Sequence, residues 1–182
     1  LALAISEPGA GSDNAALETT VKEVDGKLIM NGSKTFVSNG RNCGYLLVVA
    51  KDEDPSRENR TMSLWIVPED TPGITMVDVT EIACRPNPFS DVYFDDVEID
   101  PSWLLGERGK GFLGLMKNFE IERLLAVAVA LGFAQAAQDD AAAYASQRIA
   151  FGQPIGNFQL VQQMLVDNEV RIQNMRNFIY KT

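Results

Sequence analysis

The stretch GERGKG, residues 106–111, separates two halves of the sequence that have different periodicities. Glycine interrupts both strands and helices, so three glycines in six residues predict a hinge. Before this stretch, short apolar runs alternate with turn residues, which is typical of β-strands. After it, apolar residues recur with helical spacing. We therefore expect a β domain over residues 1–106 and a helical domain over residues 107–182.

The first half predicts short strands joined by tight turns. Asp25-Gly26 predicts a hairpin between its neighbouring runs, because this pair tolerates positive φ. Asn31-Gly32 predicts a second tight turn directly afterwards. Regularly spaced short strands favour an antiparallel barrel or sandwich, and we expect a barrel. The expected strands are residues 19–24, 27–30, 33–38, 45–50, 62–67, 74–79 and 92–99.

The second half predicts two long helices, over residues 111–146 and from 157 to the end, which makes the fold class α+β. Glycine and proline mark residues 151–156 as the loop between them. One face of the second helix is apolar, which indicates packing against a neighbouring helix. That face carries Val161, Leu165, Ile172, Met175 and Ile179.

Composition narrows the functional classes. The 182 residues include 16 Lys and Arg against 25 Asp and Glu, a formal charge of −9, with no basic cluster. Nucleic acid is therefore not an expected partner, since phosphate contacts need clustered cations. The absence of histidine removes histidine acid–base chemistry and most zinc sites, and we expect no metal. Cys43 and Cys84 lie far apart, and we expect free thiols in a reducing compartment.

No membrane contact is expected either. The longest nearly apolar run, residues 124–137, is shorter than the roughly 20 residues that a membrane-spanning helix needs. No signal peptide is visible. The sequence begins inside a strand-like run and stops inside a helix-like one, so we expect a piece of a longer protein.

Two segments of the first half could hold a ligand. The run SEPGAGSD, residues 6–13, follows a strand-like segment, and such a loop lets backbone N–H groups approach a ligand while Ser6 and Ser12 add hydroxyls. A purely structural turn would look the same. In residues 36–38, an aromatic side chain beside a hydroxyl could pack on a flat ring and bond its edge. The alternative is a buried Phe36 with an ordinary serine at the strand end.

Glu122 is the most informative position of the second half. On a helical wheel it is the one charged residue of an otherwise apolar stripe, where burial would raise the pKa of its carboxyl toward that of a general base. Glu120 lies about 160° away on the same wheel and could pair with Arg123. The alternative for Glu122 is a structural bond to an arginine from another segment. The stripe consists of Leu115, Phe119, Glu122, Ala126, Val129 and Phe133.

Four motifs in this order resemble the successive signatures of the acyl-CoA dehydrogenase family. They are EPGAGSD at residues 7–13, NGSKTFVSNG at 31–40, GFLGLMKNFEIERLL at 111–125 and QRIAFGQPIGNFQ at 147–159. The resemblance implies the family's middle β-barrel domain, followed by the first two helices of its C-terminal up-down bundle. It also implies non-covalent FAD and usually a homotetramer. The implied reaction removes the α-proton of an acyl-CoA with a glutamate and passes the β-hydrogen to FAD as hydride. The electrons then go to an electron-transfer flavoprotein.

The resemblance also assigns roles to individual residues. In the first flavin segment, Ser6 stands where the family usually has threonine, and Ser12 also matches a CoA-contacting position. In the second, Phe36-Val37-Ser38 stands where Trp-Ile-Thr is usual. Glu120 and Arg123 match substrate-contacting positions. As a lone cation near a helix end, Arg148 could instead just complement the helix dipole. The implied cofactor-binding residues are Leu3, Ile5, Ser6, Gly11, Ser12, Phe36, Val37 and Ser38, with Arg148, Phe151, Phe158 and Gln159 reaching the FAD of a neighbouring subunit.

Glu122 matches the helix position that supplies the base in isovaleryl-type and long-chain-type members. Other members place the base near the C-terminus, and Glu122 would then be a structural group near the thioester. The runs NFEIERL, QRIAFGQPIG and IQNMRN suggest the crotonobetainyl-CoA reductase subgroup, which works in the reducing direction. An oxidase using O₂ and a non-enzymatic assembly subunit remain alternatives. A cytoplasmic bacterial location is expected, or the mitochondrial matrix in a eukaryote.

Overall fold

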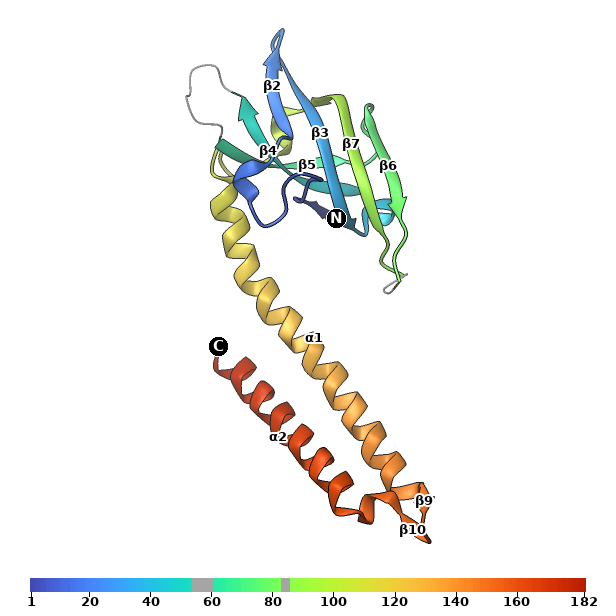
Figure 1. Ribbon diagram of the computed structural model, residues 1–182. Helices are drawn as coiled ribbons and strands as arrows, with labels where there is room; N and C mark the ends of the chain where they lie inside the picture. The colour runs from blue at the N-terminus through green and yellow to red at the C-terminus, as the bar shows by residue number, and fades with distance from the viewer. Residues whose placement is uncertain (54–60, 83–85) are drawn as a thin grey trace. The chain divides into compact units, whose positions relative to one another are not determined.

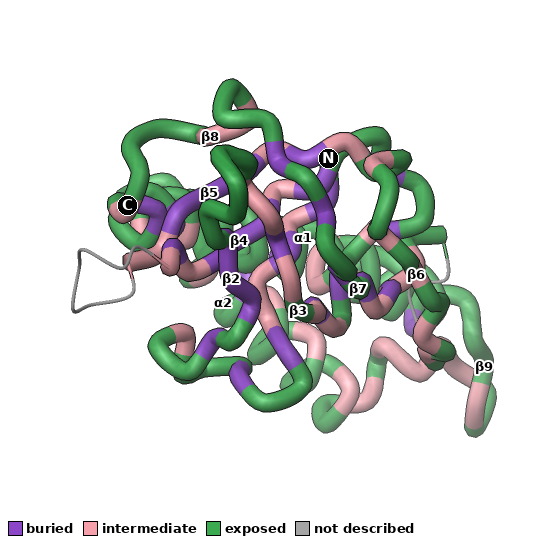
Figure 2. The backbone as a smooth tube through the Cα atoms, turned by 90° about the horizontal axis from the view of Figure 1, so that it is seen from above, coloured by how far each residue is buried: buried purple, intermediate pink, exposed green. Residues whose placement is uncertain are grey.

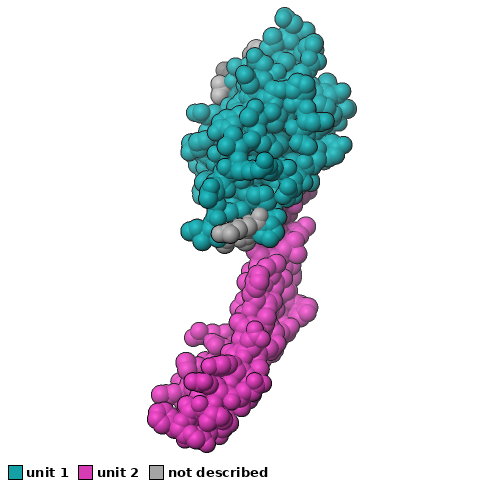
Figure 3. Space-filling model, turned by 90° about the vertical axis from the view of Figure 1, so that its right-hand side faces the viewer, with its two compact units in different colours: residues 1–115 teal, residues 116–182 magenta. Residues whose placement is uncertain are grey.

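The computed structural model describes residues 1–53, 61–82 and 86–182. They form two compact units, Leu1–Leu115 and Met116–Thr182, coloured teal and magenta in Figure 3. Of the two cysteines, Cys43 is buried and free, whereas Cys84 lies outside the described residues. Among the described residues, no helix combines the length and the apolarity that crossing a lipid bilayer requires.

The first unit is built on one eight-stranded sheet (Figure 1). Its strands follow the order β6-β7-β3-β2-β4-β5-β8, and β1 pairs with β4. Short 3₁₀ turns occur at Asn14–Ala16, Gly40–Asn42 and Pro101–Trp103. The strands are β1 (Ala2–Ala4), β2 (Thr20–Val24), β3 (Lys27–Ser38), β4 (Tyr45–Glu53), β5 (Thr61–Pro68), β6 (Ile74–Val79), β7 (Phe89–Ile99) and β8 (Leu104–Leu105).

The expectation of a purely antiparallel sheet is wrong, because β1 and β2 both run parallel to β4. β1 pairs with residues 46–48 of β4, and β2 pairs with residues 51–53. After β1 the chain leaves the sheet through residues 5–19. It then rejoins the sheet as β2, which pairs with a later part of β4. A connection of this length does not impose the reversal of direction that a hairpin turn imposes. Within the described residues, no pairing between the end strands β6 and β8 closes the sheet into a barrel.

The turn expected at Asn31-Gly32 is also wrong, since β3 runs through it without a break. Gly32 has φ 143°, at an irregularity in the pairing of β3 with β7. A Cβ atom at Gly32 would stand 2.5 Å from Oγ1 and 2.6 Å from Cα of Thr19. The glycine is therefore needed for a close approach of two backbones rather than for a reversal. The hairpin at Asp25-Gly26 is confirmed, with both residues at positive φ.

The core of the first unit lies among the central strands, where Figure 2 shows the buried stretches of the tube. Along β3 the buried side chains are Met30, Lys34 and Val37, and the two irregularities in its pairing with β7 interrupt the regular alternation of a strand. Trp65 is the largest fully buried side chain. The other large members are Met30, Leu46, Val48, Val67, Val92, Phe94 and Ile99.

The second unit is a pair of helices, and the two predicted helices are confirmed to within two residues at the compared ends. α1 (Gly111–Gln147) begins in the first unit, and α2 (Gln159–Lys181) follows a small hairpin of β9 (Ile149–Ala150) and β10 (Gln153–Pro154) and a 3₁₀ turn, Ile155–Asn157. Ile172, on the expected apolar face of α2, is buried, and the rest of that face is half-buried. The Gln138 side chain of α1 donates to the Leu165 carbonyl at 2.8 Å.

Replacing Gly32 with alanine should destabilise the first unit by roughly 1–3 kcal/mol, because the new Cβ would overlap Thr19 and the backbone would have to leave its positive φ. The measurement is the free energy of unfolding in urea. Gly44→Ala is the control, since no atom lies within 4 Å of its Cβ position. Equal stability of the two variants would show that the close approach does not constrain the strand.

Candidate functional site

The first candidate segment is held against β3 by hydrogen bonds to its backbone carbonyls. The Thr35 N–H donates to the Ser6 carbonyl at 2.8 Å. The Lys34 ammonium donates to the Ile5 carbonyl at 2.9 Å. The loop at residues 6–13 is thus bonded to Thr35, the residue directly before the second candidate segment, residues 36–38.

A buried ion pair reinforces this junction. Lys34 Nζ lies 2.7 Å from Glu7 Oε1, and the two side chains are only 0% and 5% exposed. The Glu7 carboxylate also accepts hydrogen bonds from the backbone N–H groups of Thr19, at 3.0 Å, and Glu18, at 2.5 Å. Each carboxylate oxygen therefore has a donor, as a buried carboxylate requires.

The pKa values of this pair reflect two opposing effects. Burial raises the pKa of the Glu7 carboxyl, but hydrogen bonds from Lys34, Thr19 and Glu18 outweigh burial, and the pKa ends below 4.5. Burial lowers the pKa of the Lys34 ammonium to about 8, and Glu7 only partly opposes it. Both groups are therefore mainly ionised at neutral pH.

The second candidate segment contains a β-bulge at Phe36. Lys34 pairs with Val92 and Val37 with Ser90, so Thr35 and Phe36 together oppose Asp91 alone. Phe36 has φ 54°, the left-handed region that is unusual for a bulky residue. A bulge of this kind turns a side chain away from the regular alternation and is common beside functional sites.

The bulge leaves the Phe36 ring 62% exposed, with one edge-to-face contact to Phe89 at 6.5 Å between ring centres. The alternative that Phe36 is an ordinary core residue is therefore wrong. Val37 is buried, and Ser38 is exposed again. Thr35 Oγ1 bonds Asp91 at 2.5 Å, which fixes the other bulge residue.

Three serines of the two candidate segments have free hydroxyls within the described part of the chain. Among the described residues, the side chains of Ser6, Ser12 and Ser38 have no hydrogen-bond partner. Leu3 and Ile5 are half-buried, and Gly11 is exposed with open space at its Cβ position. An exposed ring and free hydroxyls on two segments that are bonded to each other suit a flat conjugated ligand with polar edges, because the ring can pack on its face and the hydroxyls can bond its rim.

The α1 candidates are all exposed. Glu122 accepts a hydrogen bond from the Asn118 side chain at 2.5 Å. Its stripe passes from buried Leu115 to Val129 and Phe133, which are 60% and 74% exposed. Within the described chain, nothing buries the Glu122 carboxylate. The ion pair considered between Glu120 and Arg123 is not formed among the described residues.

The remaining candidates gather around the β9–β10 hairpin. Phe151 and Gly152 form its two-residue turn with φ 51° and 78°, the backbone of a tight hairpin. The Phe151 ring is 96% exposed and meets Phe158 edge-to-face at 6.2 Å. Arg148 is exposed, and its backbone bonds Tyr144 and Ile155. Gln159 is the exposed first residue of α2.

The structure thus bonds Ile5 and Ser6 to the two strand residues directly before Phe36, and separately groups Arg148 with the hairpin. Glu122 and Arg148 are 26 residues apart near one helix, so they lie about 39 Å apart along its axis. These two residues cannot act on one reacting centre within a single chain.

Glu7 and Lys34 were not predicted as site residues. A signal was available, because alternation places Lys34 on the inward face of β3 with Met30. A lysine on a buried face requires an acidic partner, and Glu7 stands in the adjacent motif.

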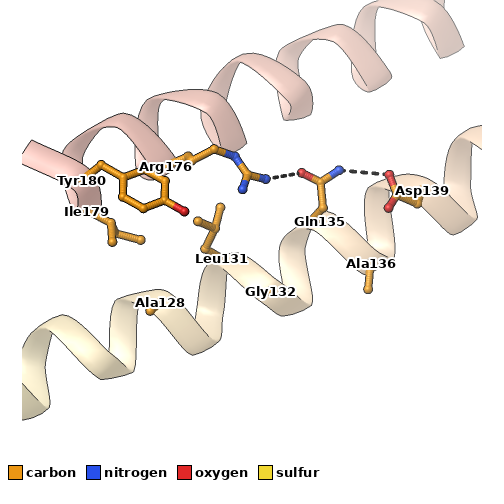
Figure 4. A pocket seen from close by; sticks show the side chains of 9 residues that line it. All are labelled: Ala128, Leu131, Gly132, Gln135, Ala136, Asp139, Arg176, Ile179 and Tyr180. Carbon is orange, nitrogen blue, oxygen red and sulfur yellow. Dashed lines mark hydrogen bonds between the residues drawn. The ribbon is translucent and has the colours of Figure 1, made fainter.

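A groove on the second unit contains none of the expected site residues (Figure 4). Within it, Arg176 donates to Gln135 at 2.7 Å, and Gln135 donates to Asp139 at 2.9 Å. Gln135 thus bonds Arg176 of α2 and Asp139 of its own helix, and apart from the Tyr180 hydroxyl the rest of the lining is apolar. Its other lining residues are Ala128, Leu131, Gly132, Ala136, Ile179 and Tyr180.

Comparison with known proteins covers nearly the whole chain. A family model described as "Acyl-CoA dehydrogenase, middle domain" matches residues 2–97, and one described as "Acyl-CoA dehydrogenase, C-terminal domain" matches residues 109–182. An Escherichia coli K12 protein named "Probable acyl-CoA dehydrogenase YdiO" is 44% identical over 180 residues, which are 99% of this chain and 47% of that protein. The chain therefore spans about half the length of such relatives.

Solved structures give the same picture. An acyl-CoA dehydrogenase from Geobacillus kaustophilus is 35% identical with a TM-score of 0.91, over 98% of this chain and 47% of that one. Butyryl-CoA dehydrogenase from Megasphaera elsdenii is 34% identical with a TM-score of 0.91, over 99% of this chain and 47% of that one.

The Glu7–Lys34 pair predicts a specific loss of stability in acid. Since the pKa of Glu7 is lower in the folded state than its usual 4.5, the unfolded state binds more protons between the two values. Its contribution is thus complete above about pH 4.5 and is lost as pH falls through the folded pKa. Unfolding in urea from about pH 7 to about pH 3 should show a shallower acid loss for Glu7→Gln than for the wild type. Parallel curves would contradict the lowered pKa.

Proposed function

Because this chain belongs to the acyl-CoA dehydrogenase family, we propose that its protein oxidises an acyl-CoA thioester between the α and β carbons, or reduces the corresponding enoyl-CoA, with FAD as cofactor. The observation that carries the proposal is the junction of residues 5–7 with residues 34–36. It places a free hydroxyl and an exposed aromatic ring on neighbouring, firmly held backbone.

FAD fits the chemistry of these residues. The exposed Phe36 ring offers an apolar face, and Ser6, Ser12 and Ser38 offer hydroxyls without a partner among the described residues. The residues proposed to hold FAD in the first unit are Leu3, Ile5, Ser6, Gly11, Ser12, Phe36, Val37 and Ser38. When bound, FAD supplies an acceptor for the β-hydrogen and its electron pair.

Glu122 is the proposed base for the α-proton. Its carboxylate takes the proton from the α carbon while the β-hydrogen leaves with its electron pair, and a double bond forms between the two carbons. The hydrogen bond from Asn118 orients the carboxylate. Ser12, Glu120 and Arg123 are proposed to contact the CoA substrate. If the base comes from elsewhere in the protein, Glu122 is a structural group near the thioester.

Arg148, Phe151, Phe158 and Gln159 are proposed to contact the FAD of a neighbouring subunit. An exposed arginine beside an exposed aromatic can bind a pyrophosphate and pack on a ring. The large distance from Glu122 along α1 supports a role at a second copy of the site. A homotetramer, an electron-transfer flavoprotein as electron acceptor and a cytoplasmic bacterial location belong to the same proposal.

The comparisons do not favour an O₂-using oxidase or a non-enzymatic assembly subunit. The crotonobetainyl-CoA reductase subgroup remains a prediction from the motifs, and the direction of the reaction distinguishes it. Bleaching by acyl-CoA reports oxidation of the substrate, whereas recolouring of the reduced protein by an enoyl-CoA reports the reverse.

The first test follows the visible flavin absorbance of the full-length protein without oxygen, with a panel of acyl-CoA thioesters. Wild type should bleach, and Glu122→Gln should bleach about 10²–10⁴ times more slowly, because the amide cannot accept the proton. Asp140→Asn removes an exposed carboxylate of the same helix and should bleach at the wild-type rate. Bleaching of Glu122→Gln at the wild-type rate would move the base to another residue.

A second test addresses the hairpin. Arg148→Ala should weaken FAD binding about tenfold or more and flatten its dependence on salt, because one charge-assisted contact to a phosphate is lost. Arg171→Ala, which removes an exposed arginine of α2, is the control. FAD affinity is read from flavin fluorescence. Equal affinities of the two variants would remove Arg148 from the cofactor site.

A further inference from the structure

We propose that the Lys34–Glu7 ion pair is a positioning device for Ser6: it fixes the backbone on both sides of this residue, presents its hydroxyl beside Phe36, and thereby sets the affinity for FAD. The inference rests on the proposed function, since it concerns the same cofactor. It assigns a role to two residues that do not themselves reach the ligand.

The geometry places Ser6 between two contacts of one ammonium group. Lys34 Nζ donates to the Ile5 carbonyl at 2.9 Å on one side of Ser6 and to Glu7 Oε1 at 2.7 Å on the other. The Ser6 carbonyl itself accepts from the Thr35 N–H at 2.8 Å. Three consecutive residues of the loop are therefore held by two consecutive residues of β3.

The same backbone then enters the bulge. Phe36 follows Thr35 directly, so Ser6 and the exposed ring are connected through a single hydrogen bond and one peptide unit. A shift of the loop by a fraction of an ångström would change the distance between the Ser6 hydroxyl and the Phe36 face. Hydrogen bonds to a flat ligand are sensitive to such shifts, because donor–acceptor distances vary within a few tenths of an ångström.

A purely structural role would not require charges here. A buried ion pair is often no more stabilising than an apolar pair of the same volume, because both ions lose their hydration. Burial depresses the pKa of Lys34 to about 8 even with Glu7 beside it, so the folded protein holds this ammonium at a cost. The ammonium fixes the position of the loop in a way that an apolar side chain could not, because its N–H groups bond the Ile5 carbonyl and the Glu7 carboxylate at the same time.

The Ser6 hydroxyl is left free by this arrangement. It has no hydrogen-bond partner among the described residues, although its backbone carbonyl is bound and both neighbouring residues are held. A loop serine whose backbone is fixed and whose side chain is free is arranged for an external acceptor or donor.

The experiment measures FAD affinity of the full-length apoprotein by quenching of flavin fluorescence. The main variant is Glu7→Gln combined with Lys34→Met, which keeps the volumes and leaves no unpaired buried charge. It should bind FAD about tenfold more weakly, the loss expected when about one hydrogen bond is misplaced. Glu7→Gln alone, which retains the Lys34 contact to Ile5, should lose less and serves if the double change does not fold.

A cycle with Ser6→Ala separates positioning from general stability. Ser6→Ala alone should weaken FAD binding roughly five- to tenfold. If the pair acts through Ser6, adding the pair substitution to Ser6→Ala should cause little further loss, instead of the roughly fifty- to hundredfold total expected for independent effects. Independent, multiplying losses would overturn the inference, as would unchanged affinity in the pair variants.

Asp52→Asn is the matched control. Asp52 is also a buried carboxylate, 4% exposed, which accepts from Arg108 Nε at 2.9 Å and from the Ser63 hydroxyl. It should lower thermal stability without changing FAD affinity. An equal loss of affinity in Asp52→Asn would attribute the effect to stability and overturn the inference. Failure of the wild type to bind FAD would instead overturn the proposed function.

Discussion

The Lys34–Glu7 ion pair is the contact on which the architecture around the candidate site depends. Glu7 lies in a glycine-rich loop in which Ala10 and Leu17 are buried but most other side chains are not. The part of the loop around Glu7 is held by its carboxylate, which accepts from three donors, one on β3 and two on the backbone before β2. Contacts with the sheet thus fix the position of a segment that has little regular secondary structure of its own.

The bulge at Phe36 complements this arrangement. In a regular strand, Phe36 and Ser38 would lie on the same face as the buried Lys34. The extra residue of the bulge reverses the faces, so that Phe36 and Ser38 are exposed and Val37 is buried. The left-handed backbone at Phe36 is compensated by the bond from Thr35 to Asp91 and by the core contacts of Val37. Local strain and surrounding order therefore occur together, as is usual beside binding sites.

Local patterns predicted the elements well and their assembly less well. The strand and helix positions and the Asp25-Gly26 hairpin followed from turn chemistry and periodicity, which act over a few residues. The turn predicted at Asn31-Gly32 was wrong. Gly32 is required there by the close approach of Thr19, which lies in another segment of the chain. The parallel pairings with β4 and the partnership of Lys34 with Glu7 also join residues far apart in sequence. The motifs identified the site segments by resemblance, whereas the contact that joins them became visible only in the fold.

The pairing of β1 and β2 with successive parts of β4 has a consequence for evolution and engineering. Both strands keep their own register on β4, so the length of the loop between them is not coupled to the hydrogen bonding of the sheet. Insertions or deletions in the exposed part of the loop, around residues 11–16, can reshape its tip while Glu7 and β2 stay in place. The length and sequence of this loop tip, and with them the groups that it presents to a ligand, can thus vary while the sheet that supports the loop stays unchanged.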